Sequence, residues 1–408
     1  MHEIFTSAEI LLPDFGKYPP YQWSVIACDQ FTGDADYWKE TAEIVGENPS
    51  TLHLILPEIY LTMPDVDQKI DDIHSHMREY LDKGIFQKYE NAMIYTERMQ
   101  SNGILRAGVI GKIDLEAYDY HKGSQSPVRA TEATVLERIP PRMKVRTGAP
   151  LELPHIMILI DDPENMAIGT CTNAKGAMQK LYSTDLMQKG GSIAGFLMNP
   201  EQQKAFLDTL EIVTKKSGSI QFAMGDGNHS LATAKAYWEE FKKNHPNIKD
   251  HPARYALVEL VNLHSDALQF EAIHRIVTET DTKALTKFLQ DTLALSEMPS
   301  SQWVTIVNGT AQKKLYIHHT TSNLSVGSLQ NALDEWLSGH AGKVDYIHGT
   351  ETITKLSAQP DAIGFLLPDM DKQDLFPSVE KDGALPRKTF SMGHAEDKRY
   401  YMEARAIQ

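Results

Sequence analysis

The sequence predicts a mixed α/β fold in two interleaved lobes with mixed sheets, which we place at residues 1–215 and 216–408. Two signals lead to this class: apolar residues at helical spacing recur along the chain, and short alternating or continuously apolar segments typical of strands lie between them. A third is a corner where a strand over residues 219–224 runs straight into a helix from residue 228 to about 243. The length of 408 residues is sufficient for two lobes with ample core.

The composition is that of an ordinary soluble globular protein, with 41% hydrophobic and 23% charged residues. Lys and Arg number 40 against 55 Asp and Glu, which gives a formal charge of -15. Such an acidic chain repels nucleic acid and anionic membrane surfaces. We therefore expect a small-molecule partner, and neither nucleic acid nor a membrane. Whether the chain forms a homo-oligomer stays open.

Two features of the chain favour a reducing cytoplasm. Cys28 and Cys171 are far apart in sequence and form neither a disulfide framework nor a metal-type pair. The first residues, Met1 to Phe5, have no basic or apolar region of a secretory signal. No apolar run approaches the ~20 residues that a membrane span needs. We expect a cytoplasmic location.

The first part of the chain shows alternating helix and strand signals. Helical spacing of apolar residues predicts helices over Ala35–Gly46 and Val66–Leu81. His74 and His76 lie two residues apart on the second helix and face different directions, so they do not form a metal pair. Apolar segments predict strands at Trp23–Ala27, Thr51–Pro57, Ala92–Thr96 and Leu105–Ile113, the last two joined by a turn.

The second part of the chain continues the alternation. The apolar run His155–Ile160 predicts a strand buried on both faces. The glycine-rich segment at residues 190–195 lacks the Lys-Ser/Thr ending of a P-loop and is interpreted as a loop. Further predicted elements are a helix at Pro200–Lys215, strands at Tyr255–Leu263 and Phe270–Val277, helices at Asp281–Leu293 and Leu329–Leu337, strands at Leu315–His318 and Ala362–Leu367, a crossing loop at Pro377–Thr389 and a strand at Tyr400–Ala406.

The corner at residues 225–230 carries the densest chemistry in the sequence, Gly-Asp-Gly-Asn-His-Ser. Gly225 and Gly227 can adopt positive φ and let a ligand approach the backbone. The N–H groups that follow, at the start of a helix, form an anion site suited to phosphate. The spacing is equally compatible with a structural N-cap at Asp226, Asn228 or Ser230. A titratable His229 directly after a strand favours a functional site.

A basic stretch at residues 129–146 stands out in this acidic chain, with Arg129, Arg138, Arg142, Lys144 and Arg146 against Glu132 and Glu137. Paired guanidinium donors suit phosphate. The alternative is a solvated surface with ion pairs, which most charge runs are.

Four segments resemble, in order, the bacterial family called domain of unknown function 1015. Gly-Asp-Gly-Asn-His-Ser-Leu-Ala-Thr-Ala at 225–234 is similar to its Asp-Gly-His-His-Arg-Tyr signature, and the other three are Val128–Thr134, Ile273–Val277 and Leu385–Phe390. The signature looks like that of ParB/sulfiredoxin-like nucleotide-binding folds, which include kinases of free serine. The chain departs from the pattern at Thr131, Asn228 and Ser230, which replace two histidines and an arginine.

The corner and the resemblance together imply a set of site residues. Asp226, His229 and Glu132 are the candidate catalytic residues, and Asp226 would also position Mg²⁺. Glu132 and Arg129 would form a facing wall. Candidate contacts to ATP or ADP are Gly225, Gly227, Asn228, Ser230, Arg129, Thr134, Arg142 and Lys388.

These residues suit phosphoryl transfer, which needs positioning and charge neutralisation. The sequence has no zinc-type Cys pair, H-E-x-x-H, G-x-S-x-G elbow or dinucleotide fingerprint, which sets other classes aside. We expect a nucleotide-dependent phosphotransferase, resembling free-serine kinases, that acts on a small hydroxyl-bearing metabolite. The alternative is a nucleotide-sensing or protein-interaction module without turnover, which the replacements at Asn228 and Ser230 favour. The sequence leaves open whether the protein is an enzyme.

Overall fold

A computed structural model of the protein describes residues 4–121 and 123–408. The chain forms two compact units: the larger comprises Met1–Ala130, Thr134–Leu268 and Gly393–Gln408, and the smaller comprises Thr131–Ala133 and Gln269–Met392. The units thus alternate along the chain. The corner strand and helix, which the sequence placed in a second lobe beginning at residue 216, belong to the larger unit. Residues 1–3, on which part of the signal-segment expectation rests, lie outside the described residues.

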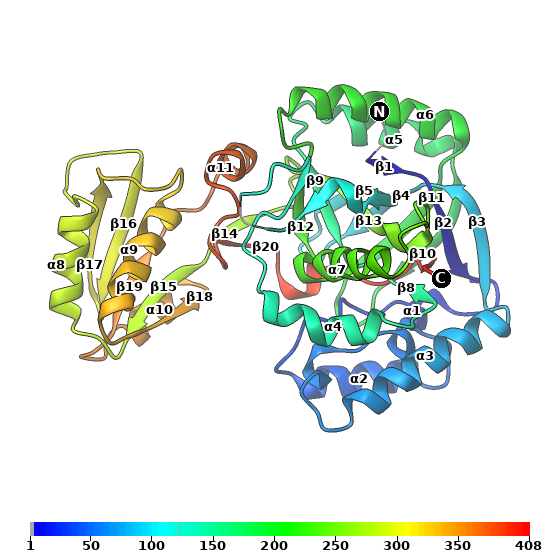
Figure 1. Cartoon of the computed structure of the whole chain (residues 1–408), viewed down its shortest axis with the longest axis horizontal. Helices are drawn as coiled ribbons and strands as arrows, with labels where there is room; N and C mark the ends of the chain where they lie inside the picture. The colour runs from blue at the N-terminus through cyan, green and yellow to red at the C-terminus, as the bar shows by residue number, and fades with distance from the viewer. Residues whose placement is uncertain (1–3, 122) are drawn as a thin grey trace. The chain divides into compact units, whose positions relative to one another are not determined.

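A ten-stranded mixed sheet forms the centre of the larger unit (Figure 1). Its middle strands combine antiparallel and parallel pairs, and β9 runs parallel to one neighbour and antiparallel to the other. All four residues of β9 are buried, as predicted for a central strand. The strand order is β10 (Gln179–Asp185), β11 (Ser192–Leu197), β4 (Ile94–Met99), β5 (Leu105–Asp114), β13 (Tyr255–Asn262), β9 (Met157–Ile160), β12 (Phe222–Asp226), β7 (Val128–Arg129) and β6 (Tyr118–Asp119), with β1 (Phe5–Thr6) beside β5.

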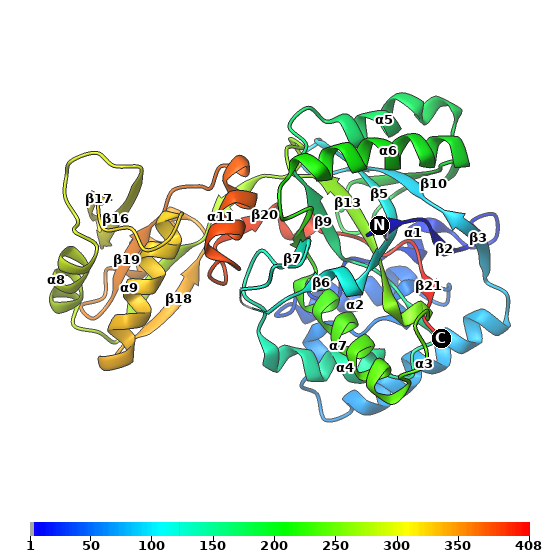
Figure 2. The same ribbon diagram turned by 45° about the horizontal axis from the view of Figure 1, so that its top comes forward.

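Helices lie on both sides of this sheet, which confirms the predicted mixed α/β class. Figures 1 and 2 show α5 (Met166–Ala174) and α6 (Pro200–Lys216) on one side. On the other side lie α2 (Ala35–Val45), α3 (Val66–Asp82), α4 (Ile139–Arg146) and α7 (Asn228–Asn244). Two short sheets, β2 (Ala8–Pro13) with β3 (Phe86–Ala92) and β8 (Leu151–Glu152) with β21 (Arg405–Ala406), complete the unit.

The smaller unit has its own five-stranded antiparallel sheet. Its apolar core includes Val277, Leu289 and Phe365, which are all fully buried. The strand order is β17 (Ala311–Ile317), β16 (Gln302–Asn308), β19 (Ile363–Leu366), β15 (His274–Thr278) and β18 (Lys343–Ile347). The remaining elements are α8 (Thr282–Thr292), α9 (Ser325–Gly339), α10 (Thr350–Leu356), α11 (Leu375–Asp382) and the pair β14 (Phe270–Ala272) and β20 (Phe390–Met392).

Several sequence-based element predictions are wrong. The segment Trp23–Ala27 does not form a strand. Trp23 is the last residue of α1 (Pro20–Trp23), which begins with a proline, and within the rest of the segment Ile26 makes an isolated antiparallel β-bridge with Tyr400. Thr51–Leu54 forms a 3₁₀ turn, since the Ser50 hydroxyl accepts the N–H of Leu52. The predicted strand at Tyr400–Ala406 is reduced to β21, and the predicted crossing loop contains α11. Among the described residues, no helix has both the length and the apolar character to cross a membrane.

Candidate functional site

The corner begins where β12 ends at Asp226, between β9 and β7 in the sheet. The register of β12 against β9 shifts between Met224 and Asp226, so the chain bulges at Gly225. Gly227 then turns the chain in the left-handed conformation, with φ 75° and ψ 29°. A Cβ atom there would also lie 3.0 Å from the Cα atom of Ile156. Both the backbone conformation and the close approach therefore require glycine.

The N-cap position of α7 is occupied by Gly227, which has no side chain to cap the helix. The interpretation of Asp226, Asn228 or Ser230 as the N-cap residue is therefore wrong. The Leu231 N–H donates to the Gly227 carbonyl oxygen (3.0 Å) as the helical ladder begins. The first-turn N–H groups before it face the start of the helix, where the helix dipole favours an anion.

The Asp226 carboxylate lies directly at this helix start. One of its oxygens accepts the N–H of Gly227 at 3.0 Å, and the other lies 3.4 Å from the Lys398 ammonium. Both side chains are less than a fifth exposed, so their charges are screened less than those of a surface pair. Sequence analysis missed Lys398, because no local pattern connects the C-terminal segment with the corner.

A hydrogen-bonded chain extends from Ser230 into the larger unit. The Ser230 hydroxyl lies 2.9 Å from Nε2 of His155, whose Nδ1 lies 2.8 Å from the Tyr401 hydroxyl. The Tyr401 oxygen also accepts the N–H of Cys28 at 3.1 Å. His155 and Tyr401 were assigned to strands in the sequence analysis, which did not connect them with the corner.

Asp29 adds a second carboxylate to this region, since its Oδ2 lies 3.9 Å from Nε2 of His155. Burial opposes its ionisation, but the neighbouring imidazole of His155, a hydrogen bond from the Gln30 side chain and the ammonium of Lys398 outweigh burial and hold the pKa of Asp29 below its usual value. Asp29, His155 and Lys398 thus join Asp226 around the helix start.

His229 is half-buried in the first turn of α7. Its Nε2 accepts the N–H of Val135 at 3.4 Å. Burial lowers the pKa of His229 to about 4, and the charges of Arg142 and Arg138 contribute. The imidazole is therefore neutral near pH 7 and acts there as a hydrogen-bonding group rather than as a cation.

The basic stretch divides into buried and partly exposed arginines. Arg129 is 3% exposed, and its guanidinium donates to the carbonyl oxygen of Ser126 and the hydroxyl of Ser219. Arg142 pairs with Glu58, and it is close enough to His229 for its charge to lower the pKa of that residue. Thr134, also in the larger unit, has a buried hydroxyl for which no partner is found among the described residues.

Glu132 and Lys388 belong to the smaller unit. The Glu132 carboxylate accepts the backbone N–H groups of Lys388 (3.2 Å) and Thr389 (3.1 Å). Burial nevertheless raises the pKa of Glu132. The guanidinium of Arg275 donates to the carbonyl oxygens of Ile273 and Lys388 in the same unit.

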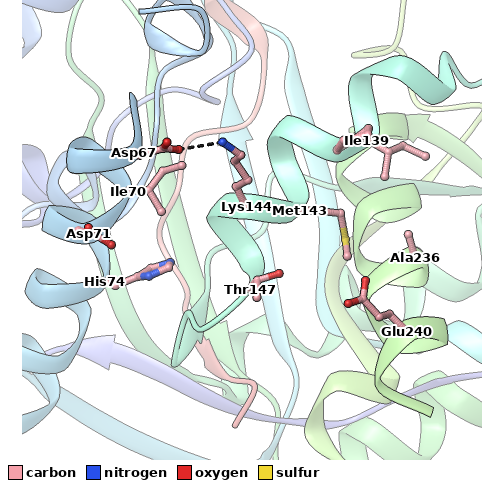
Figure 3. A pocket seen from close by; sticks show the side chains of 11 residues that line it. Asp67, Ile70, Asp71, His74, Ile139, Met143, Lys144, Thr147, Ala236 and Glu240 are labelled. Carbon is pink, nitrogen blue, oxygen red and sulfur yellow. Dashed lines mark hydrogen bonds and ion pairs between the residues drawn. The ribbon is translucent and has the colours of Figure 1, made fainter. Parts of the chain in front are cut away.

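Two hollows lie near α4 and α7 in the larger unit. One is a cavity of about 140 Å³, mainly apolar, at whose polar end lie Ser230, His155 and Tyr401. The other is an open groove between α3, α4 and α7, shown in Figure 3. Asp67, which pairs with Lys144 across the groove, and Glu240 give that groove a predominantly acidic lining. Of these two hollows, the cavity is the one whose lining includes a corner residue, Ser230.

The donor set determines which metal the corner could hold. Among the described residues, no group of three or more His, Cys, Asp and Glu side chains could hold a metal ion. Mg²⁺ commonly uses one or two carboxylates together with substrate phosphates. Asp226 fits that role for an ion that arrives with a nucleotide, because its two oxygens are carboxylate donors at the helix start.

The fold and this corner define a mixed α/β protein with a charged pair at a glycine-turned helix start. The chain belongs to the family described as protein of unknown function (DUF1015), whose model matches residues 14–341. The resemblance stated from the sequence motifs is thereby confirmed. No curated protein matches the chain.

The solved structures similar to this chain include three that share at most 10% identity with it. SbnI with a C-terminal truncation from Staphylococcus aureus shares 10% identity, with 70% of this chain and 82% of that chain covered and a TM-score of 0.38. A free serine kinase variant in complex with ADP shares 10% identity over 73% and 91% of the two chains, with a TM-score of 0.38. A conserved hypothetical protein from Pyrococcus furiosus shares 9% identity over 71% and 97%, with a TM-score of 0.34.

Proposed function

We propose that this protein is a nucleotide-dependent phosphotransferase acting on a small hydroxyl-bearing metabolite. The observation that carries the proposal is the pair of Asp226 and Lys398, 3.4 Å apart at the start of α7. A helix start attracts phosphate, a lysine neutralises its charge, and a carboxylate can position Mg²⁺ or accept a proton. The acceptor class is an analogy with the kinases of free serine that the sequence motifs resemble.

Each corner residue has a role in this proposal. The backbone of residues 225–230, with Gly227, Asn228 and Ser230, holds the phosphates of ATP or ADP. Lys398 approaches the phosphate oxygens, and neutral His229 donates or accepts a hydrogen bond beside the transferring group. Mg²⁺, when bound, would supply charge neutralisation at the phosphates, with Asp226 as its protein ligand.

The remaining candidates are assigned by prediction. The charge of Arg142 lowers the pKa of His229, so the two residues are close to each other. We propose that Arg142, which belongs to the basic stretch, contacts a phosphate of the nucleotide. Arg129 and Thr134 are proposed as further contacts to the nucleotide. The catalytic role of Glu132 and the phosphate contact of Lys388 also stay predictions.

The experiment that tests the function detects phosphoryl transfer directly. The protein is incubated with Mg²⁺ and ATP or ADP and a mixture of small hydroxyl-bearing metabolites, and ³¹P NMR follows new phosphate esters. We expect a new ester resonance with the wild-type protein and its loss with Asp226→Asn. Nucleotide that remains unchanged over hours with every acceptor would contradict a phosphotransferase.

A nucleotide sensor is the second candidate, and one observation favours it. The Ser230 hydroxyl is hydrogen-bonded to His155, and the Asp226 carboxylate accepts the N–H of Gly227. Side chains held by protein groups in this way suit a site that binds a nucleotide without reacting with it. A sensor binds nucleotide and shifts between conformations without product. Binding in a thermal-shift assay together with an unchanged ³¹P spectrum would identify this case.

A further inference from the structure

The cavity beside the corner has the size of a small ligand. Its volume is about 140 Å³. For scale, an engineered apolar cavity of about 150 Å³ stays dry and binds benzene. An occupant of this cavity therefore has about six to eight non-hydrogen atoms. Its walls are largely aliphatic, with Leu54, Met77 and Leu257 among them, so the body of that occupant is apolar.

The charged groups that line the cavity are already paired with one another. Arg142 bonds to Glu58, and Arg146 lies 2.7 Å from Glu152. Burying an ionised ligand without a counter-charge is costly. The cavity therefore favours an uncharged ligand over an amino acid or a carboxylate.

The polar end of the cavity is built around one imidazole. His155 is 6% exposed and lines the cavity together with Ser230 and Tyr401. The Tyr401 oxygen accepts the N–H of Cys28 at 3.1 Å and lies 2.8 Å from Nδ1 of His155, while the Ser230 hydroxyl lies 2.9 Å from Nε2. We assign the ring hydrogen to Nδ1, so that Nδ1–H donates to the Tyr401 oxygen and the Nε2 lone pair is directed at the Ser230 hydroxyl.

The same imidazole borders the phosphate corner. A Cβ atom on Gly227 would lie 3.4 Å from Cδ2 of His155, and Ser230 belongs to the first turn of α7. A hydroxyl group at the polar end of the cavity would therefore lie between the imidazole and the start of the helix.

We propose that this cavity is the acceptor subsite, that its ligand is a small neutral alcohol with an apolar body, and that His155 is its base. The proposal rests on the proposed function. Nε2 of His155 takes the hydroxyl proton, and the oxygen forms a bond to the terminal phosphorus of the nucleotide. The bond from that phosphorus to the bridging oxygen breaks, and the shortened nucleotide leaves with the electron pair.

Ligand binding is tested without any turnover, by saturation-transfer NMR with benzyl alcohol, serine and benzoate as probes. Ala149→Leu fills the cavity from a buried lining position, and Ala205→Leu adds the same atoms at an exposed position of α6. We expect benzyl alcohol to bind the wild type and Ala205→Leu, and to bind Ala149→Leu at least ~10-fold more weakly, as for a clash in a packed site. Serine and benzoate should show no transfer.

Equal benzyl alcohol binding by Ala149→Leu, or serine binding to the wild type as strongly as the alcohol, would overturn the proposal. Should Ala149→Leu fail to fold, Leu54→Ala enlarges the cavity instead and should shift the preference towards 2-phenylethanol. An unchanged preference would overturn the proposal in the same way.

Nucleotide titration of the same variants separates the two proposals. Ala149→Leu should keep its nucleotide affinity within about threefold, because it lies outside the phosphate corner. If the protein binds nucleotide but no alcohol, the acceptor subsite is contradicted and the proposed function is not. If it binds alcohol but no nucleotide, the phosphotransferase function is contradicted, and so is the role of His155 as its base.

The role of His155 is tested by phosphoryl transfer from ATP to benzyl alcohol. His155→Gln should lower kcat by ~100-fold or more, the usual effect of losing a general base, with KM for the alcohol little changed. Ala205→Leu is the control. A kcat that is unchanged in His155→Gln, with benzyl alcohol still bound, would overturn the assignment of the base.

Discussion

The Lys398 ammonium lies 3.4 Å from the Asp226 carboxylate, and both side chains are largely buried. The pair joins the C-terminal segment to the end of β12 at the point where α7 starts. A buried lysine at a helix start is electrostatically favourable only with an anion beside it. In the described structure Asp226 supplies that charge, and in the proposed complex a phosphate would share it.

Replacement of Lys398 by methionine removes the ammonium and keeps much of the apolar stem. Charge-assisted hydrogen bonds contribute about 1.5–3 kcal/mol, so Lys398→Met should weaken nucleotide binding by roughly tenfold or more. Calorimetric titration measures the affinity. Lys204→Met, which removes a lysine from the exposed side of α6, is the control. If Lys398→Met binds nucleotide with the affinity of the wild type, Lys398 does not contribute to nucleotide binding.

Asp226→Asn distinguishes a structural carboxylate from a reacting one. The amide oxygen can still accept the N–H of Gly227, but Lys398 loses its counter-charge, so the variant should lose about 1–3 kcal/mol of stability and remain folded. An amide is neither charged nor basic, and turnover should fall by ~100-fold or more. Melting temperature and product formation are measured on one preparation. A folded variant with undiminished turnover would show that Asp226 has a structural role only.

Arg142 and its partner Glu58 form a matched pair of variants. If Arg142 contacts phosphate, Arg142→Gln should cost at least ~1.5 kcal/mol of nucleotide binding, the value of a charge-assisted bond. Glu58→Gln removes the competing carboxylate, so nucleotide affinity should stay equal or rise. Weaker binding in Glu58→Gln and unchanged binding in Arg142→Gln would assign the arginine to structure alone. The same titration of Arg129→Ala tests the buried arginine.

His229 makes stability depend on pH in a defined direction. Its pKa in the folded protein, about 4, lies below the ordinary value of 6.5, so the unfolded state binds more protons between these values. The free energy of unfolding should therefore show no loss from His229 above about pH 6.5 and should decrease as the pH falls towards 4. Urea unfolding of wild type and His229→Gln at pH 7.5 and 5 measures the effect. The difference between the two pH values should be smaller in His229→Gln, and an equal difference would contradict the shifted pKa.

The local parts of the fold could be predicted from the sequence. The turn at residues 225–230 could be predicted because its glycines, the preceding strand and the following helix all lie within one short segment of the sequence. The prediction for Thr51–Pro57 was wrong because tertiary hydrogen bonds prevail over propensity there. The Thr51 hydroxyl donates to the carbonyl oxygen of Trp23, and the backbone takes a 3₁₀ turn instead of an extended one.

The partners of the corner could not be predicted, since they come from distant segments. His155, Lys398 and Tyr401 carry no motif, and their spacing in sequence has no relation to their distances in the fold. Only the pairing of β12 with β9, and the return of the C-terminal segment, bring these groups to the start of α7.

Calorimetric titration tests directly whether the start of α7 binds a nucleotide. The protein is titrated with ATP, ADP, CTP and GTP at millimolar concentration with Mg²⁺, beside Gly227→Val, whose side chain would clash with Ile156 and strain the backbone. We expect saturable heat with at least one nucleotide in the wild type, and its loss in a folded Gly227→Val. The absence of heat with all four nucleotides, or equal affinity in the folded variant, would contradict nucleotide binding at the start of α7.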